Sequence, residues 1–150
     1  MIGIRKIFTV IIIIGSIIIG LFACELFSSS PPTPTVTAGD TKIPTTQGSY
    51  CWNGLFSAQC VDKVYTSPID MAKEHKPTVV SPSEEIKIDF KKEPLAETMK
   101  VEQWIDEKYE KLEVKNNSIV IPKEKGVYVY YVLANWKEGD GNYAFSVEVK

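Results

Sequence analysis

The stretch that decides the fold is GVYVYYVLANWKEGDGNYAFSVEV, which spans residues 126–149. It contains two apolar-rich runs on either side of GDGN at 139–142. Glycine, aspartate and asparagine are the residues that favour tight hairpin turns. Adjacent positions of a strand face opposite sides, so Tyr128, Tyr130 and Tyr131 cannot all point into a core. The stretch therefore predicts two strands joined by a hairpin turn, with aromatic side chains on both faces.

Short runs of β-forming residues continue upstream, and turn residues such as Asn116-Asn117 separate them about every 8–12 positions. The clearest run is IKIDF at 86–90, in which apolar and charged residues alternate. Ser67-Pro68 is a helix-start pattern and predicts one short helix that ends near Pro77. The spacing predicts about seven strands, at 78–81, 86–90, 99–105, 109–114, 118–121, 127–136 and 143–149. An antiparallel sandwich of two sheets is the natural way to bury them.

The order of key residues resembles that of an immunoglobulin-like domain. The pattern P-x-x-x-I-x-I-x-F at 82–90, Trp104, and KGVYVY at 125–130 resemble its strands B, C and F. The resemblance implies that Tyr128 forms a tyrosine corner, with its hydroxyl bonded to backbone a few residues upstream. It also places Trp104 in the core. Phe90 and Tyr130 stand where antibody domains carry their inter-sheet cysteines.

Residues 47–150 also resemble a bacterial, Bacillus-type family of lipoproteins of unknown function with an immunoglobulin-like domain. The resemblance implies that fold and no established activity. The residues that carry it are GSYCW at 48–52, CVD at 60–62, KGVYVY at 125–130, Ala134, Trp136, Gly139-Asp140 and YAF at 143–145.

The N-terminus resembles a bacterial lipoprotein signal. Arg5 and Lys6 precede an apolar run that ends in LFAC at 21–24. We expect residues 1–23 to be a signal peptide and Cys24 to be lipidated, which would hold the protein on the extracytoplasmic face of the cell membrane. The alternative is an uncleaved transmembrane anchor, because the apolar run nearly reaches the roughly 20 residues of a membrane span. Both alternatives place the domain outside the cytoplasm.

A linker is expected between this anchor and the domain. Residues 28–46 are rich in serine, proline and threonine and lack an obvious apolar period. The sequence predicts a lipidated N-terminus with a disordered linker over 24–46 and a folded domain over 47–150. Extended polyproline segments rise about 3.1 Å per residue, so this linker would hold the domain several tens of ångströms from the membrane.

Cys51 and Cys60 are expected to form a disulfide, because an exported domain meets an oxidising compartment. A redox pair or a metal site are the alternatives, but the spacing is not Cys-x-x-Cys and further zinc ligands are lacking nearby. The short loop that this bridge closes carries a candidate binding face made of Tyr50, Trp52 and Phe56. The alternative is that the loop folds back as a lid and buries Trp52.

Composition and motifs argue against several functions. The chain has 17 basic and 19 acidic residues and no basic stripe, which argues against nucleic acid as a partner. His75 is the only histidine, and a solvated helix end is its default interpretation. The carboxylates alternate with lysines as on solvated faces, and EGDGN at 138–142 lacks EF-hand spacing. We expect no catalytic residues, no metal and no cofactor.

These observations favour a non-enzymatic binding or interaction module that is attached to the membrane through a lipid anchor. Its partner would be an envelope protein or a cell-wall component. The first alternative is an accessory structural or sensory domain that acts on a membrane protein. An envelope hydrolase is the second, and it would need a desolvated carboxyl group in a cleft.

Overall fold

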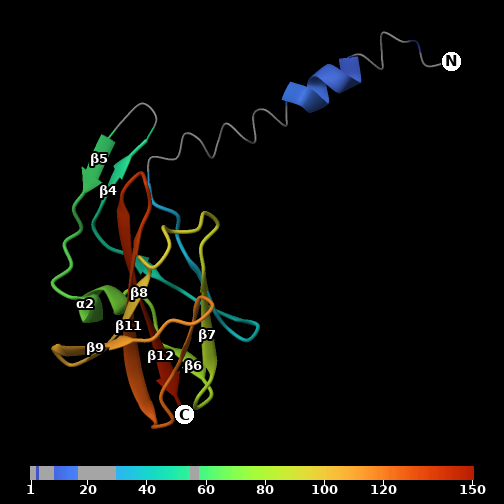
Figure 1. Ribbon diagram of the computed structural model, residues 1–150. Helices are drawn as coiled ribbons and strands as arrows, with labels where there is room; N and C mark the ends of the chain where they lie inside the picture. The colour runs from blue at the N-terminus through green and yellow to red at the C-terminus, as the bar shows by residue number, and fades with distance from the viewer. Residues whose placement is uncertain (1–2, 4–8, 17–29, 55–57) are drawn as a thin grey trace.

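The computed structural model describes residues 3, 9–16, 30–54 and 58–150. The predicted lipidation site, Cys24, and Phe56 lie outside these ranges, as does most of the predicted signal peptide. Residues 9–16 are helical (Figure 1). Among the described residues, no helix has the length and apolar character needed to cross a bilayer.

Within residues 30–54 and 58–150 all regular elements are strands apart from one short helix (Figure 1). In chain order the elements are β1 (Thr35–Ala38), β2 (Thr41–Ile43), β3 (Thr46–Gln47), β4 (Tyr50–Asn53), β5 (Ala58–Val61), α2 (Pro68–Ala72), β6 (Thr78–Val80), β7 (Glu85–Asp89), β8 (Lys100–Ile105), β9 (Lys108–Leu112), β10 (Ser118–Val120), β11 (Gly126–Asn135) and β12 (Asp140–Val149). The seven strands predicted from Thr78 onward are all found as β6 to β12.

Two sheets form the sandwich. One has the strand order β10-β7-β1-β2, and the other has the order β3-β12-β11-β8-β9, with β6 also paired to β12. The β4–β5 hairpin is a separate two-stranded sheet. All pairings are antiparallel except β6 with β12, which run parallel. The predicted all-β, immunoglobulin-like sandwich is confirmed, with one parallel pair beside its antiparallel ladders.

The core lies between the facing sides of the two sheets and follows from strand alternation. In β7, Ile86 and Ile88 are buried whereas Lys87 is exposed. On the opposite sheet the rings of Tyr130 and Phe145 stack with centroids 5.2 Å apart. The hydroxyl of Tyr130 donates to Gln103 Oε1 at 3.1 Å, so this buried polar pair is satisfied.

The β11–β12 hairpin is the longest ladder of the fold and runs from the pair Gly126–Val149 to the pair Asn135–Asp140. Its turn lies at 136–139, where the amide of Trp136 donates to the carbonyl of Gly139 at 2.7 Å. The prediction of a turn at 139–142 was therefore wrong by about three residues. The chain reverses earlier because Trp136 is buried at the strand end, and Asp140 to Asn142 then continue β12.

Two local predictions are confirmed. Ser67 caps α2, with its Oγ accepting from the amide of Asp70 at 3.2 Å, and Pro68 occupies the first turn. Asn116 and Asn117 both have positive φ, as a two-residue hairpin turn of type I′ requires, and Lys115 pairs with Ser118 across them.

The tyrosine corner is also present: the hydroxyl of Tyr128 donates to the carbonyl of Glu124 at 3.0 Å. Trp104, in contrast, does not lie in the core. Its ring is half-buried on the outer face of the six-stranded sheet, because alternation along β8 turns Val101 and Gln103 inward instead. Phe90 and Tyr130 are both buried in the core, as predicted.

The disordered linker predicted over 24–46 is wrong for residues 30–46. Val36 and Ala38 of β1 and Ile43 of β2 are buried in the main core, and β1 pairs along β7. Pro31 and Pro34 are buried too. Residues 30–34, which precede β1 and are called the strap below, also contact β12: the hydroxyl of Tyr143 donates to the carbonyl of Pro32 at 2.6 Å. The folded domain therefore begins near Ser30 rather than at residue 47.

We predict that Tyr128→Phe lowers the free energy of unfolding by about 0.5–1.5 kcal/mol, the usual net value of one hydrogen bond. Chemical denaturation would measure the change in midpoint. Tyr109→Phe is the matched control, because Tyr109 is half-exposed on β9 and its ring remains in the variant. An unchanged midpoint for Tyr128→Phe would contradict a stabilising corner.

A second prediction follows from the corrected boundary. A chain that starts at Ser30 should keep the cooperative unfolding transition, whereas a chain that starts at Gly48 should lose it. The shorter chain lacks β1, β2 and β3, so one edge of β7 loses its partner strand and the core loses the side chains of β1 and β2. Val36 and Ile43 are fully buried and contribute about 1.5–3 kcal/mol each, which is a large part of the whole stability of a small domain. Circular dichroism during heating would distinguish the two chains.

Candidate functional site

The binding face predicted on the disulfide loop does not form in the part that the structure describes: Trp52 is buried, Tyr50 is half-buried, and Phe56 lies outside the described residues. Trp52 is only 3% exposed and belongs to the main core, where its ring meets that of Trp136 edge-on at 5.7 Å. Tyr50 packs partly against the same cluster. Alternation along β4 turns these two rings inward and leaves Cys51 and Asn53 outside. The candidate face was therefore wrong, and the packing alternative describes Trp52.

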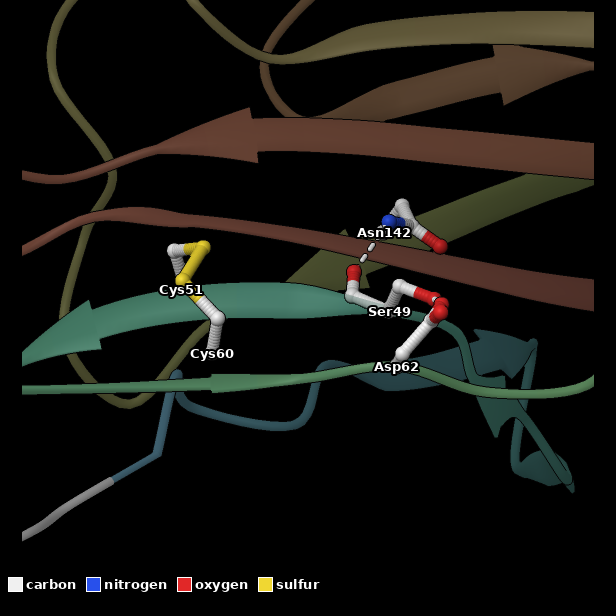
Figure 2. The surroundings of a disulfide bond; sticks show 5 residues. All are labelled: Ser49, Cys51, Cys60, Asp62 and Asn142. Atoms are coloured by element: carbon white, nitrogen blue, oxygen red, sulfur yellow. Dashed lines mark hydrogen bonds between the residues drawn. A yellow bond between two sulfur atoms is a disulfide. The ribbon is translucent and has the colours of Figure 1, made fainter.

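The β4–β5 hairpin is held together by the predicted disulfide. Cys51 and Cys60 are directly opposite each other in the ladder and are bonded. Figure 2 shows the bridge beside the contacts that attach the base of the hairpin to β12. The Ser49 hydroxyl donates to Asp62 Oδ1 at 3.0 Å, and Asn142 Nδ2 donates to the Ser49 carbonyl at 2.6 Å. The hairpin is thus fixed to the six-stranded sheet at its base.

A close backbone approach completes this attachment. Trp52 forms an isolated bridge with Gly139, and a Cβ placed on Gly139 would lie 2.0 Å from the carbonyl oxygen of Cys51. Only glycine fits there, so the turn at 136–139 and β4 are matched to each other.

A pocket of 230 Å³ opens between this hairpin base, α2 and the outer face of β11 and β12. Two tyrosines contribute to its wall, Tyr65 from the segment before α2 and Tyr131 from β11. Asn142 adds an amide and Lys63 a cation, and the full lining is Gly48, Ser49, Lys63, Tyr65, Thr66, Ser67, Pro68, Met71, Tyr131 and Asn142. Pockets for drug-sized ligands measure about 300–1,000 Å³, so this smaller pocket fits one ring or one side group of a larger ligand.

Both pocket tyrosines remain protonated at neutral pH. Burial raises the pKa of Tyr131, and the nearby Glu102 carboxylate acts in the same direction. The pKa of Tyr65 is also raised, first by loss of solvation and then by Glu74, which accepts its hydrogen bond. The pocket therefore offers neutral hydroxyl and amide groups beside two aromatic rings.

A second, more apolar groove of 380 Å³ lies at the C-terminal end of α2. Its floor includes Val127 and Val129 of β11, and its rim includes Lys73, His75 and Lys76. His75 is exposed after the end of the helix, in agreement with its default interpretation. The outer face of the six-stranded sheet thus carries a polar pocket on one side of α2 and an apolar groove on the other.

The ionisable residues form surface pairs. Lys92 Nζ lies 2.6 Å from Glu138 Oε1, and this hydrogen bond lowers the pKa of Glu138. Within the ranges that the structure describes, no three histidine, cysteine, aspartate or glutamate residues lie close enough to hold a metal.

Comparison of the chain with protein-family models, with curated proteins and with solved structures found no match in any of the three. The fold and the site therefore define this protein at the level of its class: an all-β sandwich domain with a disulfide-bridged hairpin and a tyrosine-lined surface pocket.

Sequence reasoning missed the pocket residues Tyr65, Tyr131 and Asn142. One signal was available, because alternation required one of the neighbouring tyrosines of β11 to face outward, and Tyr131 does so. Nothing in the sequence indicated that Tyr65 and α2 would cover that face.

We predict that Trp52→Ala lowers the free energy of unfolding by about 3–5 kcal/mol, the usual cost of truncating a buried tryptophan. Thermal or chemical denaturation would measure it. Val64→Ala is the control, because Val64 is 99% exposed and its truncation should be nearly neutral. A small effect at Trp52 would contradict its role in packing.

We also predict that Cys51→Ser combined with Cys60→Ser lowers the free energy of unfolding by roughly 2–3 kcal/mol, as expected for a short loop. Denaturation of the oxidised wild type and of the double variant would measure the difference. Two free thiols in the protein purified under oxidising conditions would contradict the bridge.

Proposed function

We propose that the protein is a membrane-anchored, extracytoplasmic lipoprotein whose sandwich domain is a non-enzymatic binding module. The basic, apolar and LFAC segments at the N-terminus support the anchor at Cys24. The Cys51–Cys60 disulfide supports an oxidising compartment. These two features agree with each other, and neither depends on the other.

The tether to the membrane is short. Five residues, 25–29, separate Cys24 from the start of the folded domain near Ser30. An extended chain spans about 3.3–3.6 Å per residue, so the domain would stay within roughly 20 Å of the lipid anchor. Figure 1 shows that the chain enters the domain at the end where β4 and β5 lie, whereas the C-terminus lies at the opposite end. That entry end would be the one closest to the bilayer.

The observation that carries the binding role is the pocket between Tyr65 and Tyr131. Its rings, neutral hydroxyls and the Asn142 amide match a ligand that presents hydroxyl and amide groups of its own. A cell-wall glycan with N-acetylated sugars has both kinds of group. We therefore propose a cell-wall component of this chemistry as the ligand, with one sugar ring or acetamido group in the pocket.

We predict that Tyr131→Ser abolishes the binding of soluble N-acetylated glycan oligomers, whereas Tyr131→Phe, which keeps the ring, weakens it several-fold. Calorimetry or chemical-shift titration of the full chain would measure the affinity. Tyr109→Ser is the matched control on the same sheet face, outside the pocket lining. Equal binding by all variants, or none by the wild type, would contradict the glycan proposal.

The anchor makes a separate prediction. Cys24→Ser should release the domain into the medium or leave an uncleaved precursor, because the thioether site is lost. Mass spectrometry of the wild-type N-terminus would detect the acyl chains directly. An unmodified and uncleaved N-terminus would support the transmembrane alternative instead.

A further inference from the structure

The outer edge of β9 is open. This strand is the last of the six-stranded sheet, and in the described part of the chain only β8 pairs with it. Four of its five residues are exposed, and Figure 1 shows β9 at the margin of the molecule, beyond β8 and β11. An edge strand presents unpaired amide and carbonyl groups, which another strand can complete.

The register of β8 and β9 determines which backbone groups face this edge. Ile105 pairs with Lys108 across a two-residue turn, so this closing pair exchanges both of its hydrogen bonds. Along β9, residues whose amide and carbonyl groups point towards β8 alternate with residues whose amide and carbonyl groups point away from β8. By this alternation Tyr109 and Lys111 direct their backbone groups to the open edge.

Charge determines which partner strand fits. Directly opposite residues of an antiparallel pair have side chains on the same face of the sheet, whereas neighbours along one strand face opposite sides. If a two-fold axis relates two copies of β9, the axis must therefore pass between one residue and the same residue of the second copy. This residue is the centre of the register. Centring on Lys108, Glu110 or Lys111 puts a charge against its own copy. Centring on Leu112 would need residues beyond the end of the strand.

Centring on Tyr109 is the register that brings opposite charges together. Lys108 then lies opposite Glu110 of the second copy, and the same pair recurs on the other side of the axis. Tyr109 also has the backbone orientation that a hydrogen-bonded central pair requires.

We propose that β9 pairs with β9 of a second copy of this chain, antiparallel and centred on Tyr109, so that two six-stranded sheets become continuous. The ring of Tyr109 is already held by Trp104, with centroids 5.1 Å apart and planes inclined by 22°. Gln103 Nε2 likewise holds Glu110 Oε1 at 3.2 Å. Side chains that are ordered before association lose little entropy when the copies meet.

The charges on this edge have two consequences. Lysine and glutamate on an edge strand discourage pairing with unrelated strands. The same charges favour the one self-complementary register. Two copies tethered to one membrane would meet at high local concentration, which suits a short interface.

Cysteine cross-linking of the full chain tests the register. In the proposed dimer the two Tyr109 Cα atoms lie about 5.5 Å apart, within disulfide range, whereas the two Lys111 Cα atoms lie roughly 14 Å apart. Tyr109→Cys should therefore form disulfide-linked dimer about tenfold faster than Lys111→Cys under mild oxidation. The parent chain controls for cross-links through its own cysteines, and a retained thermal transition controls for folding.

A charge reversal tests the pairing independently. Lys108→Glu should weaken self-association about three- to tenfold in sedimentation equilibrium, because it puts Glu opposite Glu110 twice. Adding Glu110→Lys to the same chain should restore association. Equal cross-linking of the two cysteine variants, no cross-linked Tyr109→Cys dimer above the parent chain, or failure of the double variant to recover would overturn the proposal.

Discussion

The ten-residue pairing of β11 with β12 is the constraint on which the rest of the structure depends. This hairpin contributes Tyr130, Phe145 and other buried side chains to the main core, and its outer face supports α2. It also provides the edges along which β8, β3 and β6 pair. The core-facing side of the hairpin is nearly continuous in buried side chains, and α2 buries Val129 and Ala144 on its outer side, whereas β7 is buried on one side only.

That burial on two sides explains why the strands from Thr78 onward could be predicted. Strong β-forming runs and Asn-Asn or glycine-containing turns determine local structure with little help from distant residues. The tyrosine corner was predictable for the same reason, since Tyr128 bonds a carbonyl only four residues away. Trp104 was misplaced because a one-residue difference in register exchanges the two faces of a strand.

The N-terminal part of the domain could not be predicted in the same way. TVTA at 35–38 has an alternating pattern, but it is short and lies in a proline- and threonine-rich segment. Its burial depends on β7, which lies about fifty positions later in the chain. The tyrosine pocket depends likewise on α2 folding over a distant sheet. Sequence patterns report local preference, and these features arise from long-range pairing.

The contact between Tyr143 and Pro32 has a mechanical consequence. In a protein tethered to the membrane at its N-terminus, as proposed above, a force transmitted through the tether would act first on the strap before β1. There the 2.6 Å hydrogen bond from Tyr143 fastens the strap to β12, an interior strand of the opposite sheet. The tension would therefore pass to the β11–β12 hairpin. It would not simply break the β1–β7 pairing one residue at a time. The strap would thus protect the β1 pairing at the end of the domain where the force is applied.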